Sequence, residues 1–383
     1  MSSHSEIFRR CTASMRFIAV AVSALALLLS SANAQQAESL ADVLSDSQWR
    51  SLERSVDRGL KWLSTQQEKD GSFDSAKVGQ PAVTSLAIMA FLSRGHQPGS
   101  GPYGKQLEAA IDYVLNAQRG DGLFSVLDAR GEYKKHQASH TASYNHAVTG
   151  LMLGEVYGMC SGKQSERVRQ AIEKALIYTW KLQRNHKDRD SDLGGWRYVA
   201  DRNDRDSDIG VTGWHLMFLR SARNAEFDVP KMFIDDALGF VRRCRVDTRK
   251  GVFSYYPDDE DEASMTMTAI GTLSLALGGQ FKDPLVKEAA DWMLDKGVED
   301  YDDNKRWHYC HYYYVQAMAQ VGGEYWRETF PKALSELVRN QRKDGRWEPS
   351  NDPKEEVFGP SYFTSLGILT LTPPYQLLPL YQR

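Results

Sequence analysis

Apolar residues follow two different patterns along this chain, and both are typical of helices. In the first pattern they recur every three or four residues, as at Trp49, Leu52, Val56, Leu60 and Leu63, which predicts an amphipathic helix. In the second they occupy nearly every position together with Ala, Gly, Ser and Thr, and a helix without a polar face is buried on all sides. Segments of the second kind cover residues 84–92, 142–156, 209–222, 263–277, 312–321 and 362–371.

A short motif of the form Q-x-x-D-G-x-aromatic separates the two kinds of helix. It occurs at residues 67–73, 118–124 and 341–347. The same frame fits Gln183, where an acidic insertion delays the closing Gly194-Gly195-Trp196, and weaker copies end at Phe253 and Trp307. Regular self-similarity of this length is the signature of a repeat protein. The chain therefore contains six units, each an amphipathic outer helix, a turn and a buried inner helix.

Six helical hairpins of this kind predict a closed ring. One hairpin cannot cover its own apolar face, so neighbouring hairpins stack side by side. An open solenoid is the alternative, but it needs polar capping repeats, and the last unit ends in the apolar tail 373–380. We predict an all-α fold, an α/α toroid (an α6/α6 double ring), in one domain that covers residues 35–383.

The first 34 residues have the composition of a secretory signal peptide. Arg9, Arg10 and Arg16 precede the apolar run 17–29, and Ala32-Asn33-Ala34 supplies small residues for cleavage. We expect the mature chain to begin at Gln35 and to be exported, to a periplasmic or extracellular location. A retained N-terminal anchor is the alternative, and no later stretch has the length and apolarity of a membrane span.

Charge and cysteine content exclude two other classes. Basic and acidic residues are interspersed at a net charge of -3, which leaves no basic footprint for nucleic acid. The three cysteines outside the signal segment are too few for a disulfide-stapled scaffold, and their pairing is open: Cys160, Cys244 and Cys310.

The repeats resemble the QW motifs of squalene-hopene and other terpenoid cyclases and of protein prenyltransferase β-subunits. In those families the Gln caps a helix end and the aromatic residue stacks beside it, tying neighbouring hairpins together. Two stretches resemble those of a bacterial exported subgroup of squalene-cyclase-repeat proteins: Gly194-Gly195-Trp196-Arg197-Tyr198 and Gly322-Gly323-Glu324-Tyr325-Trp326. The resemblance implies the toroid fold, whereas the activity has to be argued from the site.

An acidic cluster precedes the fourth of the inner segments. Asp259-Glu260-Asp261-Glu262-Ala263-Ser264-Met265 is similar to the D-x-D-D-T-A-M motif of class II terpenoid cyclases. The resemblance implies that Asp261 takes the place of the proton donor, with Asp259 and Glu262 beside it. The alternative is that the acids are solvated and favoured by the helix N-terminus. Cyclases of the family usually pair two α-barrel domains, and this chain has room for one.

A second resemblance concerns zinc. His308 and Cys310 fall where protein prenyltransferases carry two of their ligands, but Phe363 stands at the third position. A catalytic zinc site normally has three protein ligands, so we expect no metal and no other cofactor. The Asp-rich insertion 185–208 lacks the pattern of a Ca²⁺ loop and is predicted to be solvated. Asp208 is expected to cap the helix that begins at Ile209.

Aromatic residues on the inner segments are candidates for a ligand cavity, because electron-rich rings bind apolar ligands and stabilise cations. They are Tyr144, His146, Trp214, Phe218, Tyr309, Tyr312 and Tyr362. Two hypotheses remain open. The protein is an exported module that binds an apolar, isoprenoid-like ligand or a protein partner without catalysis, or it is a class II terpenoid-cyclase-like isomerase or lyase that uses Asp261.

Overall fold

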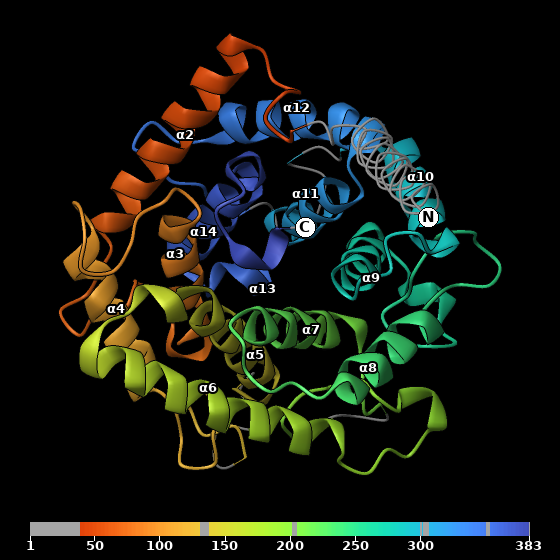
Figure 1. Cartoon of the computed structure of the whole chain (residues 1–383). Helices are drawn as coiled ribbons and strands as arrows, with labels where there is room; N and C mark the ends of the chain where they lie inside the picture. The colour runs from red at the N-terminus through yellow and green to blue at the C-terminus, as the bar shows by residue number, and fades with distance from the viewer. Residues whose placement is uncertain are drawn as a thin grey trace, which may run out of the picture. The chain divides into compact units, whose positions relative to one another are not determined.

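A computed structural model describes residues 39–130, 138–200, 205–298, 301, 306–349 and 353–382. The chain divides into residues 1–39 and 40–383, and every helix named below belongs to the second unit. In the described part of that unit, the long helices form an inner and an outer ring (Figure 1). The outer helices are α2 (Asp46–Ser64), α4 (Gly104–Asn116), α6 (Gly162–Gln183), α8 (Lys231–Arg243), α10 (Pro284–Lys296) and α12 (Gly323–Asn340). The inner helices are α3 (Ala82–Leu92), α5 (Ala138–Val156), α7 (Ile209–Asn224), α9 (Met265–Leu277), α11 (Trp307–Val321) and α14 (Gly359–Leu371).

The two apolar patterns of the sequence correspond to the two rings. Outer helix α2 buries one stripe, formed by Leu52, Val56, Leu60 and Leu63, and Ser45 caps its N-terminus in a capping box. Inner helix α3 is buried at every one of its 11 positions. Several inner helices begin before the predicted apolar segments, and α11 begins at Trp307. Trp307 therefore opens an inner helix rather than closing a turn as expected.

The ring closes on itself. Each inner helix contacts the next around the ring, and the last of them, α14, packs against the first, α3. In the outer ring α12 packs against α2 in the same way. The all-helical toroid is thus confirmed, and the open solenoid is excluded because no end repeat is left uncovered.

A glutamine-anchored turn joins each closely matching unit to its neighbour. The side-chain amide of Gln67 donates to its own turn at Gly71 O (3.0 Å) and to Gln106 O on the next outer helix (2.8 Å). Gln118 and Gln183 repeat this bridge. Gln341 donates to Ser55 O on the first outer helix (2.9 Å), so the last turn closes the ring. The same bridge from the Gln side chain, repeated in four units, therefore sets the spacing of the hairpins.

Each turn is also fastened to its own inner helix. The backbone N–H of the turn's aromatic residue donates to a side chain of that helix, at 3.0–3.3 Å. The acceptors, in chain order, are Thr84, His146, Thr212, Thr268 and Thr364. A buried N–H needs an acceptor, which explains the polar residue on an otherwise apolar helix.

The glycine of each turn has a positive φ and lies against the backbone of the next outer helix. A Cβ at Gly122 (φ +98°) would lie 2.5 Å from Lys174 O, whereas nothing lies within 4 Å of a Cβ at Gly120 in the same turn. We expect Gly122→Ala to lower the free energy of unfolding by about 3 kcal/mol, through backbone strain and overpacking. Gly120→Ala is the matched control and should change it by less than about 0.5 kcal/mol. Urea unfolding of both variants measures this, and equal effects would show that close packing of the turn does not matter.

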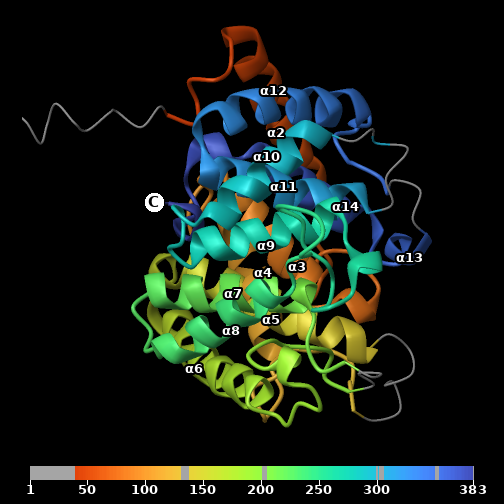
Figure 2. The ribbon, with the colours of Figure 1, turned by 90° about the vertical axis from the view of Figure 1, so that its right-hand side faces the viewer.

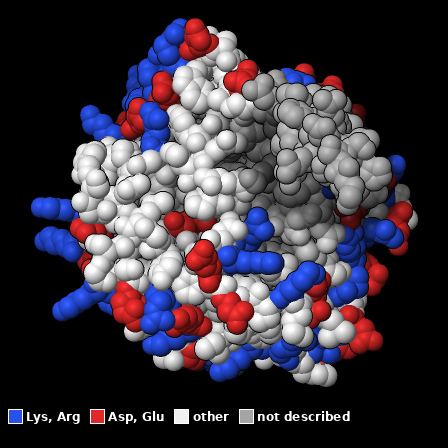
Figure 3. Space-filling model, viewed as in Figure 1, with Lys and Arg blue, Asp and Glu red and all other residues white. Residues whose placement is uncertain are grey.

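Two further features concern the environment of the chain. No helix within the described residues is long and apolar enough to span a membrane. Within the described residues, no disulfide joins any of Cys160, Cys244 and Cys310. Acidic and basic side chains are interspersed on the face that Figure 3 shows, in agreement with the mixed charge of the sequence.

Candidate functional site

Aromatic side chains from α7 and α11 meet inside the inner ring. Trp214 stacks on Tyr312, with ring centroids 5.6 Å apart and planes 10° apart. Tyr309 and Tyr313 contact the same indole from other sides, and its Nε1 donates to the Tyr309 hydroxyl at 3.3 Å. Because α9 lies between α7 and α11 in the ring, these side chains extend across the interior. They form an apolar surface with phenolic groups attached.

A buried ion pair lies near the start of α7. Asp208 is the N-cap of the helix and accepts the backbone N–H of Val211 at 2.7 Å. The Nη1 group of Arg197 donates to Asp208 Oδ2 at 2.6 Å, and the side chains of both residues are at most 3% exposed. The predicted capping role of Asp208 is confirmed. The ion pair shows that the Asp-rich insertion is not wholly solvated, and Asp192 is also buried within it.

Tyrosines from several repeats surround this pair. Arg197 donates to the hydroxyls of Tyr255 (2.8 Å) and Tyr256 (2.7 Å) and lies 3.9 Å from the ring centroid of Tyr198. The Tyr198 and Tyr255 hydroxyls are 3.0 Å apart. We call the group of Tyr144, Arg197, Tyr198, Asp208, Tyr255 and Tyr256 the tyrosine centre. Cation–π contacts and hydrogen bonds together hold the guanidinium in place.

Tyr144 on α5 completes the tyrosine centre through a close approach to α7. A Cβ at Gly210 would lie 3.2 Å from both the Tyr144 hydroxyl and Asp208 Oδ1. These two oxygens therefore face the same point, and the absence of a side chain at Gly210 lets them do so. The Nε of Arg197 is buried and has no hydrogen-bond acceptor among the described residues. Polar capacity thus remains unused at the centre.

Burial governs the protonation of the tyrosine centre. Burial raises the pKa of Asp208 above its usual value, against the opposing effects of Arg197 and the Val211 N–H. Burial likewise raises the pKa of Tyr144 and Tyr255 well above 10 and that of Tyr256 to about 12. The pKa of Arg197 is raised because Asp208 and the tyrosines outweigh its burial. At neutral pH the centre therefore holds neutral phenols around the Arg197–Asp208 pair.

The structure brings together some of the predicted cavity residues. Tyr144 belongs to the tyrosine centre, and Tyr309, Tyr312 and Trp214 form the adjoining aromatic surface. The other three lie elsewhere. His146 binds the Phe124 N–H and Thr179, Phe218 packs beneath Gly150, and Tyr362 packs on Phe358 and Phe363.

The predicted acidic residues lie at the surface. Glu260–Glu262 form a short 3-10 helix in which Asp261 and Glu262 are exposed, and Asp259 before it is half-buried. Their expected capping role belongs to Ser264, whose side chain accepts the N–H of Met267 at the start of α9. The extra 3-10 turn separates the acids from the helix N-terminus, which is why they do not cap it.

The two weak metal candidates are packed side chains. His308 is 1% exposed, and its Nε2 lies 2.9 Å from the Tyr301 hydroxyl and 3.1 Å from Glu348 O. Cys310 is fully buried, and Phe363 packs against His308 with centroids 5.4 Å apart. In the described part of the chain, no group of three or more His, Cys, Asp or Glu side chains is arranged to hold a metal ion.

Four residues of the tyrosine centre were missed by the sequence interpretation. Arg197 and Tyr198 directly follow the turn residue Trp196, and Tyr255 and Tyr256 follow two and three positions after Phe253. The repeat frame places both segments just before an inner helix. These residues lie outside the apolar inner segments, and their position just after the aromatic residue of a turn is the signal that points to them.

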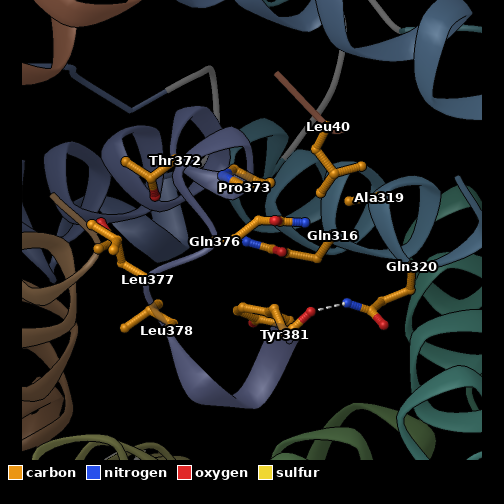
Figure 4. A pocket seen from close by; sticks show the side chains of 11 residues that line it. Leu40, Gln316, Ala319, Gln320, Thr372, Pro373, Gln376, Leu377, Leu378 and Tyr381 are labelled. Atoms are coloured by element: carbon orange, nitrogen blue, oxygen red, sulfur yellow. Dashed lines mark hydrogen bonds between the residues drawn. The ribbon is translucent and has the colours of Figure 1, made fainter. Parts of the chain in front are cut away.

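The C-terminal segment lies at one end of the ring, and α13 (Pro353–Glu356) lies at the other end (Figure 2). We call residues 372–382 the strap. The hydroxyls of Tyr381 and Tyr312 are hydrogen-bonded. The backbone carbonyl of Tyr381 accepts from Gln320 Nε2 at 2.8 Å, the bond drawn in Figure 4. Leu380 N donates to the buried carboxylate of Glu155 at 3.0 Å. The pocket beside the strap holds about 20 Å³, roughly one water molecule, so an isoprenoid does not fit in it.

Comparisons with known proteins agree with this architecture. The family model of the prenyltransferase alpha-alpha toroid domain matches residues 6–196 and 60–328. No curated protein matches the chain by sequence. Among solved structures, a variant of the type II terpene cyclase MstE from Scytonema, in complex with geranylgeranyl dihydroxybenzoate, is similar with a TM-score of 0.50 and 13% identity, over 87% of this chain and 99% of that one.

A second MstE variant, in complex with the product merosterolic acid A, has a TM-score of 0.50 at 14% identity, over 88% of this chain and 100% of that one. At such identities the structural likeness shows the fold alone. The family model covers well over half of the chain. The protein therefore belongs to the prenyltransferase alpha-alpha toroid domain family.

Proposed function

We propose that the toroid binds an apolar, isoprenoid-like molecule at the aromatic surface inside its ring and does not convert it. The observation that carries this is the convergence of Trp214, Tyr309 and Tyr312 across the interior, next to the tyrosine centre. Aromatic rings offer a large apolar contact area, and their hydroxyls fix the orientation of a ligand. MstE, which has the same fold, was solved with a geranylgeranyl compound, and this supports the ligand class.

Class II cyclisation is the second candidate, favoured by the fold of MstE and by a buried carboxylate at the head of an inner helix. Protonation of an alkene requires a neutral acid in an apolar environment. Asp208 has the environment, and burial raises its pKa, but its carboxylate is paired with Arg197, which opposes protonation. Asp261 is exposed to solvent, which keeps its carboxyl group out of an apolar environment. The likeness to MstE supports the cyclase alternative, and we propose binding without protonation because Asp261 is exposed and Asp208 is paired.

The signal-like segment 1–34 motivates the further proposal that the protein acts outside the cytoplasm. Mass spectrometry of the intact secreted protein should give the mass of a chain that begins at Gln35. A mass that still includes the N-terminal segment would contradict export in soluble form. The binding experiment below uses this mature protein.

Geranylgeraniol is a suitable probe for the ligand site. We expect saturable binding to the mature protein, seen as a rise in melting temperature with probe concentration, because a ligand of the folded state stabilises it. Trp214→Phe should weaken binding about fivefold to tenfold, since it removes stacking area worth about 1 kcal/mol. Trp62→Phe, on an outer helix, is the matched control and should leave affinity unchanged.

The same mixtures distinguish the two candidate functions. Mass spectrometry after incubation should recover only unchanged geranylgeraniol. A cyclic isomer of the probe would instead establish the cyclase function, and the absence of saturable binding would refute both.

A further inference from the structure

We propose that the strap is a pH-dependent latch: ionisation of the Glu155 carboxylate beneath it releases residues 377–382 and uncovers Tyr312 at one end of the aromatic surface. The latch is a property of the chain without ligand, whereas its role in admitting a ligand rests on the proposed function. Three features carry the proposal: a fixed base of the strap, an end that reaches the aromatic surface, and a buried carboxylate that holds this end.

The base of the strap is fixed by aromatic and cation–π contacts. Tyr375 packs edge-on against Trp49 of α2, with ring centroids 5.5 Å apart, and the Arg94 guanidinium lies 4.7 Å from the centroid of its ring. The next residue, Gln376, has φ +51°, a left-handed conformation that is unfavourable for a residue with a side chain. A fixed residue followed by a strained one places a hinge at Gln376.

The end of the strap, residues 377–382, reaches the aromatic surface. Its 3-10 turn, Pro379–Tyr381, packs against α7. The Tyr381 hydroxyl is hydrogen-bonded to that of Tyr312, whose ring stacks on Trp214. Figure 1 shows the C-terminus over the middle of the ring. Rotation of this end about the hinge would therefore uncover Tyr312.

The buried carboxylate of Glu155 on α5 holds the 3-10 turn. It accepts from Leu380 N at 3.0 Å and from the Ser221 hydroxyl of α7 at 2.6 Å. Glu155 is 3% exposed and Leu380 is 2% exposed, so the closed strap leaves almost no water at the carboxylate. Opening the strap would remove the Leu380 contact and let water reach Glu155.

No positive charge compensates the Glu155 carboxylate. It forms no ion pair with the described residues, and neither Arg220 nor Arg223 of α7 binds it. The titratable groups that interact with it are the phenols of Tyr312 and Tyr381, and burial raises the pKa of both, so they stay neutral at pH 8. Burial without a paired cation disfavours the ionised form of Glu155, so ionisation favours the open strap.

The direction of the pH effect follows from proton linkage. Burial raises the pKa of Glu155 from its ordinary value of 4.5 to about 7, so stabilisation of the closed strap is lost as pH rises through about 7. If the open strap restores the ordinary pKa, the equilibrium constant for opening increases about tenfold from pH 6 to pH 8. Global stability rises over the same range because of the buried histidines, so the two kinds of opening change in opposite directions.

Hydrogen exchange of the C-terminal amides tests the latch without any ligand. Mass spectrometry of the peptide that covers residues 377–382 gives their protection factor, corrected for the intrinsic exchange rate at each pH. We expect this factor to fall about tenfold from pH 6 to pH 8 in the parent chain. It should stay constant in Glu155→Gln, whose amide oxygen still accepts from Leu380 N. Peptides from α3 report global unfolding and should lose no protection.

Two further variants make the test specific. Glu328→Gln removes an exposed carboxylate and should behave as the parent chain does. Tyr381→Phe removes the hydrogen bond to Tyr312 and should lower protection at both pH values, with the same change between them. Constant protection in the parent chain, or an equal fall in Glu155→Gln, would overturn the latch.

The role of the latch in ligand entry is measured separately, as the rate at which geranylgeraniol changes the tryptophan fluorescence. We expect the association rate constant to rise about tenfold from pH 6 to pH 8 in the parent chain and to be independent of pH in Glu155→Gln. A constant rate despite a falling protection factor would overturn the role in entry. Absence of binding at both pH values would refute the proposed function, and hydrogen exchange would still decide on the latch.

Discussion

Acidification from pH 7 to pH 5 is expected to lower the free energy of unfolding, because four buried histidines resist protonation in the folded chain. Burial lowers the pKa of His146 and His308 to about 3, that of His311 to about 4 and that of His215 well below its usual value. Below about pH 6.5 the unfolded chain binds protons that the folded chain does not, so stability falls with pH. His146, His308 and His311 alone should cost about 6 kcal/mol at pH 5, and His215 adds to this loss.

Urea unfolding at pH 7, 6 and 5 measures this loss. His146→Asn should be less stable at pH 7, since the Phe124 N–H and Thr179 lose their partner, but should lose about 2 kcal/mol less on acidification. His186→Asn is the control, because the His186 side chain is 88% exposed. The same pH dependence in both variants would contradict a buried neutral His146.

Glu155→Gln is expected to stabilise the protein above pH 7. Glu155 is buried between the strap and α7, where it accepts from Leu380 N at 3.0 Å and from the Ser221 hydroxyl at 2.6 Å. Burial raises its pKa to about 7, against the opposing effect of these two hydrogen bonds. Tyr312 and Tyr381 also face it, and burial raises the pKa of both above 10. At pH 8 the folded chain therefore holds a buried carboxylate that forms no ion pair with the described residues.

The sign follows from proton linkage. The pKa of Glu155 is higher in the folded chain, so its contribution to stability is lost as pH rises from about 4.5 through about 7. Between pH 5 and pH 8 the stabilisation by Glu155 should fall by about 2.5 kcal/mol. About 2 kcal/mol of this fall occurs between pH 5 and pH 7, where it opposes the gain in stability that comes from the buried histidines. The difference in unfolding free energy between Glu155→Gln and the parent chain should grow with pH by this amount.

Glu328→Gln serves as the control for charge removal, because the Glu328 side chain is 55% exposed and pairs only with Lys332 at the surface. If the difference in unfolding free energy between Glu155→Gln and the parent chain does not vary with pH, the Glu155 carboxylate is hydrated beneath the strap. Because Leu380 lies on the strap, proteolysis of the C-terminus at pH 8 and pH 6 reports whether ionisation also loosens this segment.

Much of the fold was determined by the sequence alone, because its signals are local. Helical spacing at Leu52, Val56 and Leu60 specifies a buried stripe, and a Q-x-x-D-G-x-aromatic turn specifies its own hydrogen bonds. Closure also followed from the sequence, since a repeat with an apolar end has to be covered. Trp214, Tyr309, Tyr312 and Tyr144 were identified as interior aromatic residues for the same reason. A side chain on a helix without a polar face has nowhere else to go.

Only the tertiary structure decided which polar groups meet. Tyr144, Arg197 and Tyr255 come from different repeats, and their contacts depend on the rotation and spacing of three neighbouring hairpins. The sequence pattern drew attention to Asp261, which a short 3-10 turn places in solvent, whereas Asp208 is buried opposite Arg197. Charge state and reactivity depend on burial and on partners distant in sequence. Neither is encoded in local periodicity, and for that reason only the tertiary structure identifies Asp208 as the buried, paired acid.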